Sequence, residues 1–206
     1  MKRILVSLDH FIGQKTNGDH MDIFRGFIAI DVPISTILQD LLDSIKGTRA
    51  NVKVVEAKNI HITLKFLGDT QIIHIEKIEE IIKESIRSTQ PFTLQLKGTG
   101  VFPNERYVKV LWVGIQQAEP LIPIVKDLNS KLNNLGYKKE NKPFSAHLTI
   151  GRMRSAEGKN DILEILHQHG DTLFSEIPVN SIKLKQSVLT PKGPIYSTKK
   201  EIMLKS

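Results

Sequence analysis

Apolar residues follow two different spacings along this chain, and the spacings predict strands and helices in a regular order. Residues 25–33, RGFIAIDVP, form a mostly apolar run that predicts a buried strand ending at Pro33. In residues 34–47 the apolar positions recur every three to four residues, which predicts an amphipathic helix that stops at Gly47. The residues on its apolar face are Ile34, Ile37, Leu38, Leu41 and Ile45.

The first half of the chain continues with the same alternation of strands and helices. Residues 51–68 predict extended structure, as two strands or as one strand with a bend. Residues 71–88 predict a second helix, and residues 91–100 predict a strand that begins at Pro91. The apolar positions of the second helix are Ile75, Ile78, Ile82 and Ile86. The predicted order is therefore strand, helix, strand, helix, strand.

The second half repeats this order. Its predicted elements are a strand over 107–115, a helix over 119–136, a strand over 142–152, a short helix over 160–170 and a strand over 179–190, followed by 192–204. Because the spacing between elements also agrees, we infer an internal duplication. The sequence predicts an α+β fold of two lobes related by an approximate two-fold axis, each an antiparallel sheet with helices on its outer face.

The predicted domain boundaries set the first residues apart from the rest. Residues 22–206 are expected to form a single bilobal domain. Residues 1–21 are polar and rich in turn-forming residues towards Met21, and they are expected to be an extension, either a tag or an early start.

Two of the predicted strands carry the same short motif, HITLKFLG from His61 and HLTIGR from His147. Residues i and i+2 of a strand share a face, so each histidine is expected to point the same way as the threonine two positions later, Thr63 or Thr149. The intervening apolar residues are expected to fill the lobe cores, and Phe66 is expected to join them. If the two lobes face each other, both His/Thr pairs line one cleft between them.

Composition narrows the chemistry that such a cleft can perform. The chain has no cysteine, which excludes a disulfide framework and thiolate chemistry. The absence of cysteine also suits a reducing cytoplasm, where we expect the protein to act. No apolar run approaches the roughly 20 residues that span a bilayer, so we expect no membrane role. The formal net charge of +7 fits a polyanionic partner such as nucleic acid, and it equally fits lysines dispersed over the surface.

Two histidines in one cleft can act as an acid–base pair, because the imidazole titrates near neutral pH. Such a pair suits attack on a phosphodiester, where one ring removes a proton from the nucleophile and the other protonates the departing oxygen. The hydroxyls of Thr63 and Thr149 can donate to the non-bridging phosphate oxygens. This chemistry needs no metal and no other cofactor.

Two structural alternatives remain open for the repeated motif. Each histidine could simply bond a neighbouring backbone carbonyl, with the threonines present as ordinary strand formers. Metal binding is the other alternative, but threonine is a poor ligand and no Asp, Glu or Cys recurs at matched positions. The histidines of the HQH segment, His167 and His169, have no match in the first half and are expected at the surface.

Two basic residues of the motif segments are further candidates. Arg152 would bring a positive charge to the same phosphate, but strict alternation places it opposite His147. It therefore reaches the site only if the strand ends or twists at Gly151, and otherwise it is an exposed arginine at a strand end. Lys65 shares the His61 face under strict alternation and is a candidate substrate contact.

Four segments together resemble the RNA 2′,3′-cyclic phosphodiesterase family, also called 2′-5′ RNA ligase, within the two-histidine phosphoesterase superfamily. They are NIHITLKFLG, GVFPNERYVKVLWVGI, KPFSAHLTIGR and GPIY, and the similarity runs from about Phe24 to the C-terminus. One departure is Val55, where family members often have tryptophan.

The resemblance implies hydrolysis of an RNA 2′,3′-cyclic phosphate to a 2′-phosphomonoester, with His61 protonating the leaving 3′ oxygen and His147 activating water. It also implies reversible joining of tRNA halves through a 2′-5′ linkage. The sequence has no G-x-x-x-x-G-K-[ST] loop, in keeping with a reaction that does not use ATP.

A protein of a different class remains an alternative, namely a non-catalytic module that binds RNA ends in the same cleft. The few aromatic residues expected near loops, Phe102, Tyr107 and Tyr196, could stack on bases, and Tyr196 is a candidate substrate contact in either case. Both hypotheses predict an RNA partner, and we expect the protein to act as a monomer.

Overall fold

The computed structural model describes residues 22–191 and 193–205, so the extension predicted over residues 1–21 lies outside the described residues. The described elements, in chain order, are β1 (Ile23–Asp31), α1 (Thr36–Gly47), β2 (Val52–Val54), β3 (His61–Gln71), α2 (Ile75–Ser85), β4 (Phe92–Asn104), β5 (Tyr107–Gln116), α3 (Leu121–Asn134), β6 (His147–Met153), α4 (Lys159–Gln168), β7 (Leu173–Val179), β8 (Ser181–Thr190) and β9 (Gly193–Met203). Short 3₁₀ turns over Ala57–Asn59 and Ile72–His74 precede β3 and α2.

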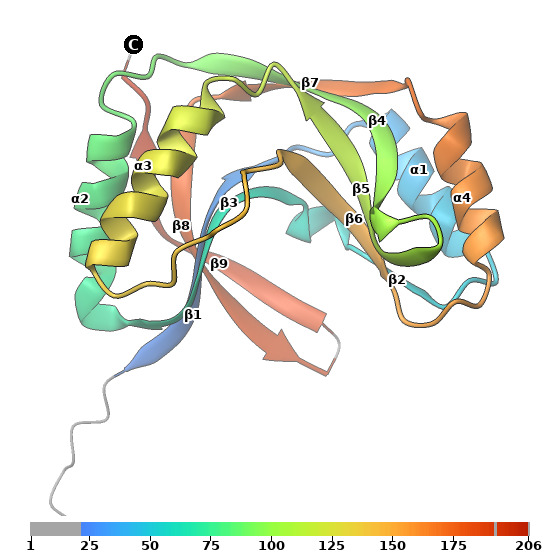
Figure 1. Cartoon of the computed structure of the whole chain (residues 1–206), viewed down its shortest axis with the longest axis horizontal. Coiled ribbons are helices and arrows are strands. Elements are labelled where there is room, and N and C mark those ends of the chain that lie inside the picture. The colour runs from blue at the N-terminus through green and yellow to red at the C-terminus, as the bar shows by residue number, and fades with distance from the viewer. Residues whose placement is uncertain (1–21, 192, 206) are drawn as a thin grey trace, which may run out of the picture.

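The strands form two antiparallel sheets, which confirms the predicted α+β class. The first sheet has the order β3-β1-β8-β9, and the second has the order β2-β6-β5-β4-β7. Figure 1 shows the sheets meeting at the centre of the molecule, with α2 and α3 at one end and α1 and α4 at the other. Each lobe is therefore a sheet with two helices on its outer face.

The two lobes do not correspond to the two halves of the sequence. The second sheet contains β2 and β4 from the first half, and the first sheet is completed by β8 and β9 from the second half. The helices follow the same exchange, because α1 packs with β2, β7 and α4, whereas α3 packs with β3 and α2. Periodicity identifies a helix or strand but carries no information about which sheet it joins.

Helix α1 shows how local sequence defines an element. Its N-cap residue, Ser35, accepts a hydrogen bond from the backbone N–H of Leu38 at 3.2 Å, and its hydroxyl donates to the carbonyl of Phe174 at 2.8 Å. The cap thus satisfies a free N–H of the first turn and also ties the helix to β7. The helix buries one face against the second sheet, through Leu38, Leu41, Leu42 and Ile45.

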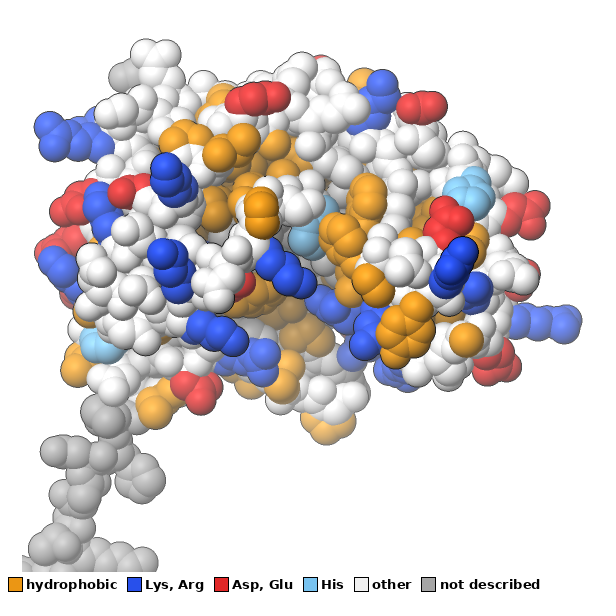
Figure 2. Space-filling view, in the orientation of Figure 1, with side chains coloured by type: hydrophobic (Ala, Val, Ile, Leu, Met, Phe, Trp, Pro, Cys, Tyr) orange, Lys and Arg blue, Asp and Glu red, His pale blue; other side chains and the backbone are white. Residues whose placement is uncertain are grey.

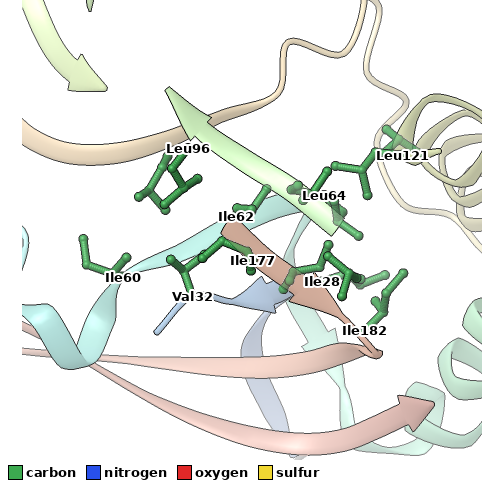
Figure 3. Packing of buried hydrophobic residues seen from close by; sticks show 14 of the residues in the cluster. Ile28, Val32, Ile60, Ile62, Leu64, Leu96, Leu121, Ile177 and Ile182 are labelled. Atoms are coloured by element: carbon green, nitrogen blue, oxygen red, sulfur yellow. The ribbon is translucent and has the colours of Figure 1, made fainter. Parts of the chain in front are cut away.

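The buried residues of both lobes form one continuous hydrophobic cluster. Figure 3 shows part of it, with residues drawn from both sheets and from α3. Its labelled members include Ile28, Ile62, Leu64 and Ile182 of the first sheet, Leu96 and Ile177 of the second, and Leu121 of α3. Because the core is shared, it holds the two sheets, and the motifs they carry, in a defined position relative to each other.

Candidate active site

The two motif-bearing strands, β3 and β6, contact each other where the sheets meet (Figure 1). The second and fourth residues of each motif are buried, namely Ile62, Leu64, Leu148 and Ile150. The first and third residues, the histidine and the threonine, lie on the opposite face and stay partly exposed. The structure therefore brings both His/Thr pairs towards the junction of the lobes.

Both strands contain a β-bulge at the fourth residue of the motif. In β3, Thr63 pairs with Ala29 and Lys65 pairs with the adjacent Ile28, which leaves Leu64 as the extra residue. Neighbouring residues of β1 face opposite sides, so Thr63 and Lys65 also face opposite sides.

The bulge in β6 has the same position. Thr149 pairs with Trp112 and Gly151 pairs with the adjacent Leu111, so Ile150 is the extra residue. The first six residues of both strands then share one burial pattern: partly exposed, buried, partly exposed, buried, buried, exposed. This repetition supports the predicted internal duplication, which stays a prediction.

After the bulge, the sixth residue of each motif returns to the histidine face. In β6 this residue is Arg152, which pairs with Val110 and is exposed, so a bulge at Ile150, and not an end or twist at Gly151, places it on the histidine face. In β3 the sixth residue is Phe66, which is 60% exposed. The prediction that Phe66 fills the core was therefore wrong, because strict alternation does not continue past Leu64.

The same bulge overturns the expected position of Lys65. Its side chain has no solvent exposure, and its ammonium donates to Asn129 Oδ1 at 2.8 Å and to the carbonyl of Lys138 at 2.5 Å. Burial lowers the pKa of Lys65, and the nearby carboxylate of Glu140, 3.8 Å away, opposes that change. Lys65 therefore anchors α3 and the following loop to β3 and does not lie on the face of His61.

Each histidine is held by a hydrogen bond to the carbonyl two residues earlier. The distance is 2.7 Å from His61 Nδ1 to the oxygen of Asn59, and 2.8 Å from His147 Nδ1 to the oxygen of Ser145. A carbonyl oxygen only accepts, so Nδ1 carries the proton and Nε2 is left for a substrate. The carbonyl bonds expected for purely structural histidines are thus present, and they also leave both Nε2 atoms without a proton and open to a ligand.

Aromatic rings pack edge-on against both histidines. The ring of Tyr196 lies 5.1 Å from the ring of His61 at an interplanar angle of 87°. The ring of Phe102 lies 5.1 Å from that of His147 at 85°. Phe27 also contacts both His61 and Tyr196, with ring centroids 4.9 Å and 5.1 Å away. These contacts restrict the rotation of each imidazole, which favours a fixed geometry for proton transfer.

The hydroxyl of Tyr196 is influenced by charges from both lobes. Burial raises the pKa of its hydroxyl, and the positive charges of Arg152 and Arg25 act in the opposite direction. The structure therefore brings Tyr196 of the first sheet close to both His61 and the arginine of the second motif.

A charged cluster that the sequence did not predict lies beside His61. Asp31 pairs with His61 in the ladder between β1 and β3 and hydrogen-bonds to both Lys183 and Lys185 of β8. Burial raises the pKa of Asp31, but the hydrogen bonds and charges of the two lysines outweigh it and leave the pKa lowered. Polar residues alternate along β8, at Lys183, Lys185 and Ser187, but only the pairing of β8 with β1 shows that they approach the site.

The protonation of His61 is set mainly by its surroundings in the first sheet. Burial lowers the pKa of its imidazole below the ordinary value of 6.5. The hydrogen bond to Asn59 and the charge of Asp31 raise it, and the charge of Lys185 lowers it further. The neutral form of the ring is therefore favoured in the free protein.

The described histidines and carboxylates show no arrangement suited to a metal ion. In the described part of the chain, no three His, Cys, Asp or Glu side chains gather as a metal ion would require. His167 is 63% exposed and bonds Glu105 at 2.8 Å, which confirms its surface position. Among the same residues, no helix is long and apolar enough to cross a membrane.

Comparison with known proteins identifies the family. Residues 33–185 match the 2′-5′ RNA ligase superfamily, a range that includes both motifs. The chain therefore belongs to this superfamily, as the resemblance of its motifs implied, and it is an enzyme of that family.

Similar curated proteins cover most of the chain. The RNA 2′,3′-cyclic phosphodiesterase of Methanocaldococcus jannaschii is 39% identical over 179 residues, which is 86% of this chain and 99% of that protein. The protein of the same name from Methanothermobacter thermautotrophicus is 32% identical over 175 residues, or 84% of this chain and 95% of that protein.

Solved structures share the fold. The crystal structure of TT0787 from Thermus thermophilus has a TM-score of 0.74 and 26% identity, and it covers 87% of this chain and 97% of its own. The structure of Escherichia coli LigT complexed with 3′-AMP has a TM-score of 0.67 and 23% identity, and it covers 90% of this chain and 100% of its own. The second likeness concerns the fold alone.

Proposed function

We propose that this protein hydrolyses the 2′,3′-cyclic phosphate at the end of an RNA strand to a 2′-phosphomonoester. The observation that carries the proposal is the repetition of one His/Thr arrangement, with the same bulge and the same Nδ1–carbonyl bond, on two strands that contact each other. The names of the similar proteins in two archaea support the same substrate.

The proposed reaction needs one proton acceptor and one proton donor. Nε2 of His147 takes a proton from water as the water oxygen forms a bond to phosphorus. Nε2 of His61 gives a proton to the ribose 3′ oxygen as its bond to phosphorus breaks. The product carries the phosphate on the 2′ oxygen, and a proton exchange with solvent restores both rings.

Donors around the phosphate stabilise the charge that grows during the reaction. The hydroxyls of Thr63 and Thr149 lie on the histidine face of their strands and donate to the two non-bridging oxygens. Arg152 adds a full positive charge from the same face. Lys65 takes no part, because its ammonium is enclosed on the helix-covered side of the sheet.

The lowered pKa of His61 is compatible with its role as the donor. In the free protein burial favours the neutral ring. A bound cyclic phosphate places a negative charge beside Nε2, and a nearby negative charge raises the pKa of an imidazole. Substrate binding itself therefore charges the proton donor.

Aromatic residues beside the phosphate site suit the terminal nucleotide. Phe66 reaches this face from β3 and is 60% exposed, and the partly buried Tyr196 reaches it from β9. Stacking on aromatic rings is a common way to bind an unpaired base without reading its sequence. The base of the terminal nucleotide is expected to contact Phe66.

Joining of RNA ends is part of the proposal as the reverse reaction. A 5′-hydroxyl in place of water would attack the cyclic phosphate and form a 2′-5′ linkage, with the same two histidines and no ATP. Mixing a strand that ends in a cyclic phosphate with a 5′-hydroxyl strand, such as two tRNA halves, tests it. A joined product is expected in which the junction alone resists a 3′-5′-specific ribonuclease.

The decisive experiment follows a defined oligoribonucleotide that ends in a 2′,3′-cyclic phosphate. Product should accumulate in large excess over protein, with the phosphate on the 2′ oxygen, and chelator treatment should leave the rate unchanged. The His61→Ala and His147→Ala variants should lose turnover, and the His167→Ala variant, which alters a surface histidine, should keep it. Stoichiometric binding without product would instead identify a non-catalytic module for RNA ends.

A further inference from the structure

A second concave region adjoins the proposed active site on the second sheet. It is a hollow of about 390 Å³ between the start of β5, the end of β6 and the start of α4. Of the described residues that line it, none is acidic and five are basic. We call it the basic groove, and its members are Arg106, Tyr107, Lys109, Arg152, Arg154 and Lys159.

The basic groove is continuous with the active site through Arg152. This arginine is the sixth residue of the second motif and pairs with Val110, two residues from the partner of Thr149, Trp112. Tyr107, at the start of β5, is 60% exposed and also lines the groove. A ligand that contacts Thr149 and Arg152 therefore enters the groove as it extends along β6.

The positive charges of the groove are not neutralised by the protein. In residues 22–191 and 193–205, no carboxylate forms an ion pair with Arg106, Arg152 or Arg154. The nearby carboxylate of Glu105 is bound to His167, and Lys159 donates only to the backbone oxygen of Glu105.

Such a concentration of like charge is unfavourable unless an anion compensates for it. Figure 2 shows Lys and Arg side chains in a band across the lower half of the face, with Asp and Glu mostly at its margins.

The groove also offers a site for a base. The ammonium of Lys109 lies 4.8 Å from the ring centre of Tyr107 and packs over one of its faces. An aromatic ring among arginines and lysines is the combination with which proteins bind single-stranded nucleic acid, since the ring stacks on bases and the cations bind phosphates. Arginine in particular can hold a phosphate through two parallel hydrogen bonds.

We propose that the basic groove binds the sugar–phosphate backbone of the nucleotides that precede the cyclic phosphate in the same RNA strand. This inference rests on the proposed function, because the terminal phosphate fixes where the strand starts. The strand leaves the terminal ribose through its 5′ oxygen, and the next phosphates need cations that the His/Thr pairs do not supply. The protein would thus bind an oligonucleotide more tightly than a cyclic mononucleotide.

The test compares substrates of increasing length with variants of the groove. The substrates are adenosine 2′,3′-cyclic phosphate and oligoribonucleotides of two, four and eight residues with the same end. In the Arg106→Gln/Arg154→Gln variant, KM for the longer substrates should rise about tenfold or more, with kcat unchanged. Mononucleotide kinetics should not change. The slope of log KM against log salt should fall by about 0.7 for each lost phosphate contact.

A matched variant controls for net charge. Arg87→Gln/Lys126→Gln also removes two exposed positive charges, but from the turn after α2 and from within α3 on the helix-covered side, and it should behave like the wild type. Thermal unfolding verifies that both variants are folded. An equal KM increase in the control, or an unchanged length dependence in the groove variant, overturns the proposal.

Two further outcomes separate this inference from the proposed function. Equal losses on the mononucleotide and the oligonucleotides would show that the groove residues act at the reacting phosphate, which also overturns the proposal. If the wild type turns over neither substrate, the proposed hydrolysis fails. Fluorescence anisotropy with a labelled cyclic-phosphate octamer then tests RNA binding by the groove independently of hydrolysis. The groove proposal is supported only if the groove variant binds the octamer more weakly than the control variant does.

Discussion

The two halves of the proposed active site have the same backbone conformation and different surroundings. The first half-site consists of His61, Thr63 and Phe66 on β3, and the second consists of His147, Thr149 and Arg152 on β6. Both have the bulge at the fourth residue and the bond from Nδ1 to the carbonyl two residues earlier. Around the first histidine lie a tyrosine and a partly buried charged cluster, whereas the second histidine contacts a phenylalanine and its strand continues through Arg152 into the basic groove.

The backbone sets the positions of the two histidines, and the neighbouring side chains set the environment of each. The common backbone places two equivalent imidazoles, so geometry alone gives no reason for one to donate a proton and the other to accept it. The assignment depends on the neighbours, because burial and the charges of Asp31 and Lys185 act on His61. Variants that exchange or remove these neighbours should therefore reveal which histidine has which role.

Loss of either histidine should have the largest effect. His61→Ala and His147→Ala should each lower kcat by about 10²- to 10⁴-fold, because each removes one proton transfer from the reaction. Single-turnover kinetics on a cyclic-phosphate oligonucleotide measures the loss, and anisotropy should show that the RNA still binds.

A modified substrate then distinguishes the two variants. Sulfur in place of the 3′ oxygen leaves as a thiolate, which needs no proton donor. His61→Ala should recover most of its loss on this substrate, and His147→Ala should not. Equal recovery would contradict the assignment of donor and acceptor.

The sixth residues of the motifs should give smaller and different losses. Arg152→Ala should lower kcat by about 10- to 150-fold, since a hydrogen bond to a charged group contributes ~1.5–3 kcal/mol. Phe66→Ala should mainly raise KM, by about fivefold or more, since stacking on a base contributes ~1 kcal/mol or more. Steady-state kinetics separates these effects, and the Phe66→Tyr variant, which keeps a ring, should remain close to wild type.

The pH dependence should report the environment of His61. As the proton donor, His61 must be protonated, so kcat/KM falls as pH rises through its pKa, which burial places below 6.5. The charge of Lys185 lowers that pKa and the charge of Asp31 raises it. The alkaline limb of the kcat/KM profile should therefore move to higher pH in Lys185→Gln and to lower pH in Asp31→Asn. A limb unaffected by both changes would show that it belongs to another group.

Replacing Lys65, the fifth residue of the first motif, should lower stability and leave catalysis almost unchanged. Lys65→Met removes an enclosed ammonium and leaves the oxygens of Asn129 and Lys138 without this donor, which should cost about 1–3 kcal/mol of unfolding free energy. Urea unfolding measures the cost. The kcat/KM of Lys65→Met should stay within about twofold of wild type. The fifth residue of the second motif is Gly151, which has no side chain and so makes no equivalent anchor. A tenfold fall in a folded Lys65→Met protein would return Lys65 to the active site.

The sequence predicts correctly on which face of its strand each residue before the bulge lies, and it fails for the residues after the bulge. Alternation correctly places His61, Thr63, His147 and Thr149 on one face, because their strands are regular up to that point. It misplaces the residues that follow, since a bulge depends on the register with a neighbouring strand. Two bulges at the same motif position in both repeats would be a usable signal once one structure of the fold is known.

Long-range pairing explains the other differences. The type and order of the helices and strands were predictable, because both follow from local periodicity. The partners of Asp31 come from β8, almost at the other end of the chain, and nothing near Asp31 in the sequence indicates them. The α+β class was therefore accessible from the sequence, whereas the charged cluster and the assignment of helices to lobes required the fold.

The exchange of strands between the lobes has a consequence for biosynthesis. Strand β1 lies between β3 and β8, so the register of Arg25 with Ser187 can form only when most of the polypeptide has left the ribosome. A product of premature termination before β8 would retain both histidines and yet lack the strands that complete the sheet under the first of them. Such shortened chains are expected to be inactive on a cyclic-phosphate oligonucleotide, although they contain every residue of the repeated motif.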